Sequence, residues 1–141
     1  MRAVHAPVSI AAAVVLLVPF LALAESWRAF GVSSPNVLFS VDEASLKREG
    51  SKAYFVERLV FVVPVQRDAS SGQMIKEKRV PRVMDCAART QGYLRGSLLA
   101  ADGRLIEAVT TDPADLKMTA IPTPSLAAEE LGWACAAGKQ P

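Results

Sequence analysis

The chain has 141 residues, with 16 lysines and arginines against 14 acidic side chains, so its formal net charge at pH 7 is only +2. This balance argues against nucleic acid as the partner, because domains that bind nucleic acid carry a strong basic excess on one face. The only histidine is His5. The rest of the chain therefore lacks the commonest general base and metal ligand, and we expect no enzymatic activity, no metal and no cofactor.

The first 24 residues are typical of a cleavable secretory signal peptide. Arg2 supplies the positive start, an apolar run extends from Val8 to Leu23, and Ala22-Leu23-Ala24 forms the cleavage site. The run is shorter than the roughly 20 residues of a membrane-spanning helix, which favours a signal over an uncleaved anchor. The residue directly after the cleavage site is Glu25 and not cysteine, so the pattern does not fit a lipoprotein. We predict a signal peptide at 1–24 and one domain at 25–141, periplasmic or secreted, without a stable membrane anchor.

The first half of the exported domain is rich in strand signals. Trp27 to Val32 and Val37 to Val41 flank a turn cluster and predict two strands. Asp42 to Leu46 resembles a single helical turn, because Asp42 can cap it. Tyr54 to Val65, rich in Tyr, Phe and Val, predicts the strongest strand of the chain.

Within this strand, the run from Leu59 to Val63 is apolar without a break. Such a run indicates that both faces of the strand are covered, or that one face meets another subunit. Leu59, Phe61 and Val62 are therefore candidates for a subunit contact in a homodimer. Pro64 then restricts pairing on one side of the strand, as at a sheet edge or a bulge.

A hairpin loop at Asp68 to Gly72 leads into a return strand from Met74 to Cys86, where Pro81 indicates an edge or a bend. The return strand carries the main charge cluster, formed by Lys76, Lys78, Arg79 and Arg82. This cluster can bind an anionic partner, such as a sulfated glycan or an acidic loop. The alternative is a solvated edge strand whose lysines prevent aggregation.

The rest of the chain predicts one more hairpin and a helix. Tyr93 to Ala100 and Leu105 to Thr111 are strands joined by a tight turn that contains Asp-Gly. A helix begins near Thr123 or Ser125, either of which can cap it, and continues to about Ala134. Glu129 and Glu130, well inside this helix, are expected to face solvent.

The two cysteines, Cys86 and Cys135, predict one disulfide, because an exported protein matures in an oxidising compartment. The bridge would pin the helix to the strand that carries Cys86. The expected fold is α+β: an antiparallel sheet of five to six strands with a C-terminal helix packed on it.

Several segments together resemble the bacterial surface-adhesin protein E family. They are Phe39 to Gly50 followed by a valine-rich strand, Met84 to Thr90 with its Asp-Cys-x-x-Arg pattern, Ala101-Asp102-Gly103, and Ile121 to Ser125 followed by Leu131 and the final Cys135. The chain departs from the family in lacking a lipoprotein cysteine, and in carrying Met118 where the family usually has Trp. The resemblance implies binding to host matrix or plasma proteins, and dimerisation.

The sequence therefore predicts a non-enzymatic binding protein of the bacterial envelope, or a secreted one, and the family resemblance implies that it is an adhesin. The alternative is a periplasmic housekeeping or inhibitor protein that contacts another envelope protein. A surface-protease shaving test on intact cells separates these two hypotheses.

Overall fold

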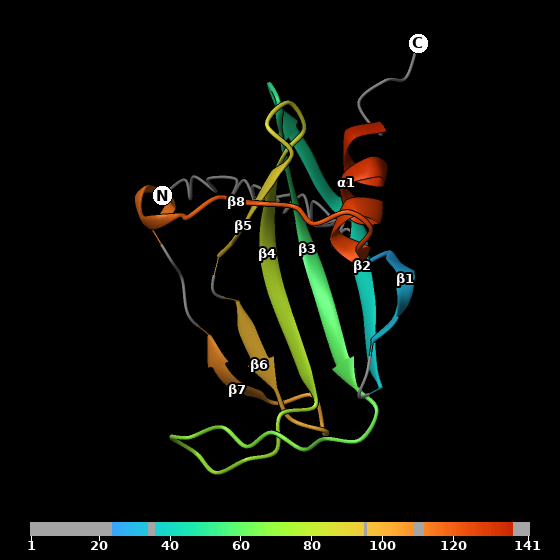
Figure 1. Cartoon of the computed structure of the whole chain (residues 1–141). Coiled ribbons are helices and arrows are strands. Elements are labelled where there is room, and N and C mark those ends of the chain that lie inside the picture. Colours follow the sequence, from blue (N-terminus) through green and yellow to red (C-terminus); the bar gives the residue numbers. More distant parts are fainter. Residues whose placement is uncertain (1–23, 34–35, 95, 109–111, 137–141) are drawn as a thin grey trace, which may run out of the picture.

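The computed structural model describes residues 24–33, 36–94, 96–108 and 112–136. Within these ranges the chain forms one antiparallel sheet of eight strands and one α-helix (Figure 1). The elements are β1 (Trp27–Ser33), β2 (Val37–Glu49), β3 (Lys52–Phe61), β4 (Glu77–Asp85), β5 (Thr90–Tyr93), β6 (Ser97–Leu99), β7 (Leu105–Ala108), a 3-10 turn (Pro113–Asp115), β8 (Thr119–Ala120) and α1 (Leu126–Ala136). The predicted signal peptide lies almost wholly outside the described residues. In the described part of the chain, no helix is long and apolar enough to cross a membrane.

The strands follow the order β1-β2-β3-β4-β5-β8, and β6 pairs with both β4 and β7. The expectation of five to six strands was too low for two reasons. The segment predicted as one strand from Tyr93 to Ala100 divides between β5 and β6, which pair with different halves of β4. The change of neighbour falls at Val80 and Pro81, and Pro81 has no N–H with which to extend the ladder. β8 is too short to leave a sequence pattern.

Asp42 to Leu46 forms part of β2, so the prediction of a helical turn there was wrong. The register between β2 and β3 shifts between Asp42 and Lys47, where β2 bulges. The Asp42 Oδ1 atom accepts hydrogen bonds from the backbone N–H groups of Ala44 (3.1 Å) and Ser26 (2.9 Å). The Ser45 hydroxyl accepts one from Val56 N–H on β3 (2.9 Å). The polar side chains that suggested a helix start therefore hold a β-bulge.

The core lies between α1 and one end of the sheet. Its buried side chains are Val41, Ala53, Phe55, Met84, Ile121, Leu131 and Ala134. Trp133 of α1 packs edge-on against Phe55 and Phe30, with ring centroids 5.3 and 5.7 Å apart. We call the face of the sheet that carries Val41 and Phe55 the helix-side face, and the other the opposite face.

Both ends of α1 are held as the sequence indicates. At its start, the Ser125 hydroxyl accepts a hydrogen bond from Ala128 N–H (3.1 Å), so Ser125 is the N-cap. At its end, Cys135 forms the predicted disulfide with Cys86, which follows β4; the two Cα atoms are 5.8 Å apart. Arg48 of β2 donates to the carbonyl oxygens of Ala134 and Cys135 at 3.0 and 3.1 Å. The disulfide prediction is confirmed.

Candidate protein-contact face

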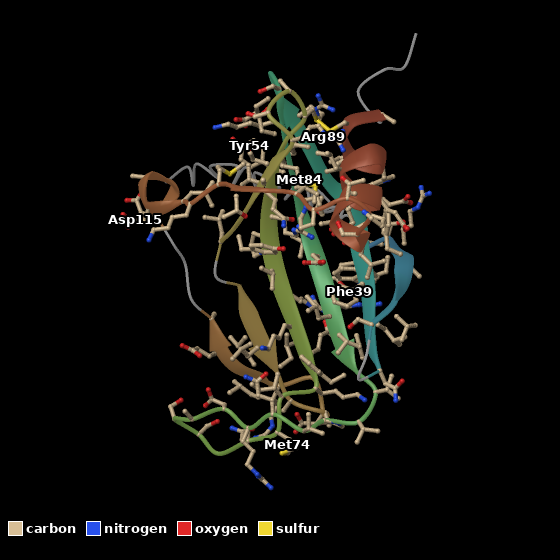
Figure 2. The ribbon with its side chains drawn as sticks, viewed as in Figure 1. Phe39, Tyr54, Met74, Met84, Arg89 and Asp115 are labelled. Atoms are coloured by element: carbon tan, nitrogen blue, oxygen red, sulfur yellow. A yellow bond between two sulfur atoms is a disulfide. The ribbon has the colours of Figure 1, made fainter. Side chains whose placement is uncertain are left out.

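Beyond the core, the helix-side face continues as a row of side chains that α1 does not cover. Directly paired residues in a sheet point to the same side, and the register places Phe39, Leu59, Lys78, Leu98 and Glu107 side by side on β2, β3, β4, β6 and β7. We call these five residues the open row. None belongs to the buried cluster around α1, and Figure 2 shows Phe39 below the helix. The first four are half-buried and Glu107 is exposed.

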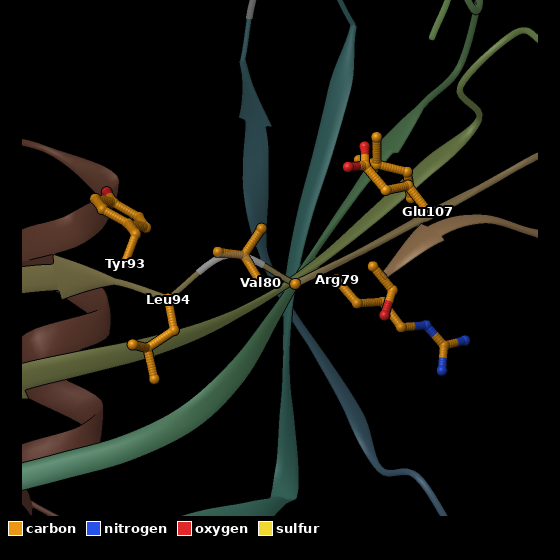
Figure 3. Close-up of a pocket in the computed structure, with 8 residues that line it drawn as sticks. Arg79, Val80, Tyr93, Leu94 and Glu107 are labelled. Carbon is orange, nitrogen blue, oxygen red and sulfur yellow. The ribbon is translucent and has the colours of Figure 1, made fainter. Parts of the chain in front are cut away.

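A pocket of about 410 Å³ adjoins the open row where β4, β5 and β6 meet (Figure 3). Its walls include Val80, Tyr93, Leu94, Leu98 and Glu107. It forms where the chain leaves β5 and enters β6, opposite the break at Pro81. The crossing requires glycine at position 96, because a Cβ atom there would lie 1.7 Å from the Arg79 carbonyl oxygen. Its size falls in the range of ordinary ligand pockets, about 300–1,000 Å³, and suffices for a partner's side chain.

The structure divides the predicted basic cluster between different environments. Lys76 donates from Nζ to the carbonyl oxygens of Phe61 (2.6 Å) and Val62 (3.0 Å), so its charge is engaged at the end of β3. Lys78 lies in the open row with its ammonium 5.5 Å from the centre of the Phe61 ring. In the described part of the chain, Lys78 forms no ion pair. Its charge is therefore available to a partner.

Arg79 lies on the opposite face. Its guanidinium donates to the carboxylates of Glu77 (2.7 Å) and Glu25 (2.5 Å), and the hydrogen bond to Glu77 raises the pKa of Arg79 above its usual value. It also lies 5.5 Å from the Trp27 ring, which Arg58 approaches at 4.2 Å. The guanidinium of Arg79 is thus paired on the face opposite to Lys78, although Arg79 also lines the pocket.

Arg82 is buried, with a relative exposure of 2%. Its Nη1 atom donates to the carboxyls of Glu57 (3.1 Å) and Glu130, and its Nη2 atom donates to the Gln91 side-chain oxygen. The prediction that Arg82 belongs to an exposed anion-binding cluster was therefore wrong. The reason is its position opposite Phe55 on the helix-side face, where α1 covers it.

Glu130 is also buried, at 0% exposure, so the expectation that it faces solvent was wrong; Glu129 is exposed as predicted. Glu130 lies four residues before Ala134, one turn away on the buried side of α1. Burial, and secondarily the Glu57 carboxylate, raise the pKa of Glu130 to about 8 despite the opposing charge of Arg82. At neutral pH Glu130 is therefore mostly protonated, which limits the negative charge beside Arg82.

Tyr93 connects this buried cluster to the pocket. The Arg82 guanidinium lies 4.5 Å from the centre of the Tyr93 ring, and the Tyr93 hydroxyl donates to the Gln91 side-chain oxygen (3.3 Å). Burial also raises the pKa of Tyr93. Tyr93 has a relative exposure of 51% and lines the pocket. Tyr93 therefore has one side against the buried ions and another toward solvent.

Sequence reasoning placed Leu59 and Phe61 on a contact surface, and the structure sets both on the uncovered part of the helix-side face. Val62, 48% exposed, lies just past the end of β3.

Sequence reasoning missed the pocket, Tyr93 and the buried Glu57. The signal for Glu57 was its position two residues after Phe55 in an alternating strand, which puts a charge on the buried face. No three Asp, Glu or Cys side chains of the described ranges are grouped so as to hold a metal ion.

No protein-family model and no curated protein sequence match the chain. Its fold does resemble two solved structures of protein E from Haemophilus influenzae. Crystal form II of that protein aligns with a TM-score of 0.53 and 12% identity, over 72% of this chain and 83% of the other. The selenomethionine form aligns with a TM-score of 0.51 and 10% identity, over 70% and 78%. At this identity the likeness concerns the fold alone, and the chain is similar in fold to protein E.

Proposed function

We propose that this chain is an exported, non-enzymatic binding protein of the bacterial envelope that contacts a protein partner through the open row and its pocket. The observation that carries the proposal is the open row beyond α1, which joins apolar side chains, a lysine without an ion-pair partner among the described residues, and a pocket. The fold likeness to protein E supports the proposal, and so does the resemblance of the sequence to the surface-adhesin family.

The chemistry of the row suits a protein surface as partner. Phe39, Leu59 and Leu98 supply apolar area, while Lys78 and Glu107 supply opposite charges. Protein interfaces commonly combine apolar area with a few charged groups, and here Lys78 lies between Leu59 and Leu98 while Glu107 lies at one end of the row. The pocket can hold one large side chain of the partner, and such buried anchors contribute most of the binding energy of many interfaces.

We propose host extracellular-matrix or plasma proteins as the partner class, following the family resemblance. The alternative is another envelope protein, contacted by a periplasmic housekeeping or inhibitor protein. Of the predicted anion contact, Lys78 is the member that stays within this proposal, because Arg82 is buried and Arg79 is paired on the opposite face. Binding through Lys78 should weaken as salt is added, since an exposed charge is screened.

The predicted subunit contact uses the same region. Phe61 lies beside Lys78, so a second copy would compete with the partner for this surface. Sedimentation of the wild-type protein and of Phe61→Lys tests this possibility. A dimer that the substitution dissociates would support the contact, and a wild-type monomer would remove it.

The binding proposal is tested with a matched pair of leucines on the two faces. Leu98 lies in the open row, and Leu38 of β2 is 42% exposed on the opposite face. The protein, produced from its complete gene so that any leader is processed, is applied to immobilised matrix and plasma proteins. We expect Leu98→Lys to weaken binding by about tenfold or more, which corresponds to about 1.4 kcal/mol, and Leu38→Lys to leave it unchanged. Equal binding by both variants would contradict the proposal.

A further inference from the structure

The carboxyls of Glu57 on β3 and Glu130 on α1 converge on a single nitrogen, Arg82 Nη1. Their relative exposures are 4% and 0%, and that of Arg82 is 2%. Two carboxylates and one guanidinium would carry a net negative charge in the core, which is strongly unfavourable. One retained proton makes the group neutral, and it lets one carboxyl donate to the other. The Oε1 atom of Glu130 has no hydrogen-bond partner among the described residues, so no other donor replaces that proton.

The other elements around Glu130 bring no second cation of the described residues to the carboxyl pair. On β2, Arg48 is turned to the last carbonyls of α1. On β1, Arg28 pairs with Glu43 at 3.3 Å. The β5 residues that face the cluster are Gln91 and Tyr93, which are uncharged at neutral pH, and Glu129 on α1 is exposed. The charge of the cluster therefore depends on one proton.

Arg82 transmits this charge state toward the pocket. The Nη1 atom of its guanidinium donates to both carboxyls, and the Nη2 atom donates to Gln91. The guanidinium carbon also lies over the Tyr93 ring. Gln91 accepts hydrogen bonds from both Arg82 and the Tyr93 hydroxyl through the same oxygen. Tyr93 and Leu94 then form part of the pocket wall (Figure 3). A movement of Arg82 toward the carboxyls thus removes support from the Tyr93 ring.

We propose that the proton held by Glu57 and Glu130 sets the shape of the pocket, through Arg82 and Tyr93. With the proton bound, Arg82 is shared between the carboxyls and Gln91, and Tyr93 forms the pocket wall. When Glu130 gives its proton to solvent, two carboxylates compete for Arg82, the guanidinium turns away from Gln91, and Tyr93 moves. The pocket is therefore in its binding form at neutral and acidic pH and changes under alkaline conditions. This device adds regulation to the pocket and does not depend on the identity of the partner.

The test uses the two tyrosines of the chain, Tyr54 and Tyr93. Isotope labelling of tyrosine gives a pair of ring signals, which are followed by NMR as pH is raised from acidic to alkaline, together with the Glu side-chain carbons and the amides of Gly96 and Leu98. We expect the Tyr93 ring and the pocket amides to shift with a midpoint at about 8, matching one glutamate signal, before the phenol titrates. Tyr54 should not follow this midpoint.

The matched variants are Glu130→Gln and Glu129→Gln, which are adjacent on α1 but buried and exposed respectively. Glu130→Gln should abolish the midpoint at Tyr93, and Glu129→Gln should preserve it. A glutamate that titrates near this pH while Tyr93 and the pocket amides stay still would overturn the proposal. So would a Tyr93 shift that persists in Glu130→Gln. If Glu130→Gln does not fold, the wild-type glutamate and tyrosine titrations decide the question alone.

Discussion

Replacing Arg82 by Ser separates the buried ion cluster from the exposed charge cluster that the sequence suggests. The side chain makes three charge-assisted hydrogen bonds, to Glu57, Glu130 and Gln91. Its removal leaves two buried carboxyls without their cation, and breaking a buried pair in this way costs about 3–5 kcal/mol. A surface substitution such as Lys78→Ser should change the free energy of unfolding by no more than about 0.5 kcal/mol.

The assay is equilibrium unfolding in urea or guanidinium chloride at neutral pH, with the disulfide intact in both variants. The expected loss is a large part of the total stability, which is about 5–15 kcal/mol for a domain. Failure of Arg82→Ser to fold, while Lys78→Ser folds normally, agrees with the expectation. If the two variants differ by less than about 1 kcal/mol, Arg82 does not hold α1 to the sheet, and the description of the buried cluster is wrong.

Three more outcomes follow from specific contacts. Because the pKa of Glu130 is raised from 4.5 to about 8 in the folded state, the folded chain keeps its proton longer than the unfolded chain. The stability that this group contributes is fully present below its pKa in the unfolded chain and is lost as the pH rises toward its pKa in the folded chain, by at most about 1.4 kcal/mol per pH unit. In Glu130→Gln, the free energy of unfolding should decline less over this pH range. Alkylation without reduction should label neither cysteine, and reducing the bridge, whose cysteines are 49 residues apart, should cost about 4 kcal/mol. Gly96→Ala should cost about 3 kcal/mol in chemical unfolding, because the new methyl group meets the Arg79 carbonyl oxygen. The control Gly132→Ala, with nothing within 4 Å of its Cβ, should stabilise the exposed position in α1 by about 0.5–1 kcal/mol.

Local signals in the sequence were sufficient where a segment's structure depends on its own residues. The loop at Asp68 to Gly72 is such a case: Asp68 accepts hydrogen bonds from Ser70 and Ser71 within the loop. These hydrogen bonds also lower the pKa of Asp68. The Asp102-Gly103 turn is similar, with Gly103 at a φ of 80°. The Ser125 cap depends on its own helix in the same way.

The predictions from sequence were wrong where residues distant in the chain determine the local structure or the burial of a side chain. Asp42 and Ser45 are compatible with a helix start and with a bulge, and hydrogen bonds from the backbone of Ser26, just before β1, and of Val56 on β3 select the bulge. In the sequence Arg82 resembles the basic residues beside it, yet the two carboxyls with which it pairs in the core lie 25 and 48 residues away. The pocket arises from the exchange of β5 for β6 beside β4, and no single segment encodes that exchange.

Photo-crosslinking from the two faces of the sheet tests the proposed contact most directly. A photoreactive residue is placed at Leu98 in the open row or at Leu38 on the opposite face, and each protein is irradiated while bound to a matrix or plasma protein that it retains. We expect a covalent adduct from position 98 and none from position 38. An adduct from position 38 alone would place the partner on the opposite face and contradict the proposed binding surface.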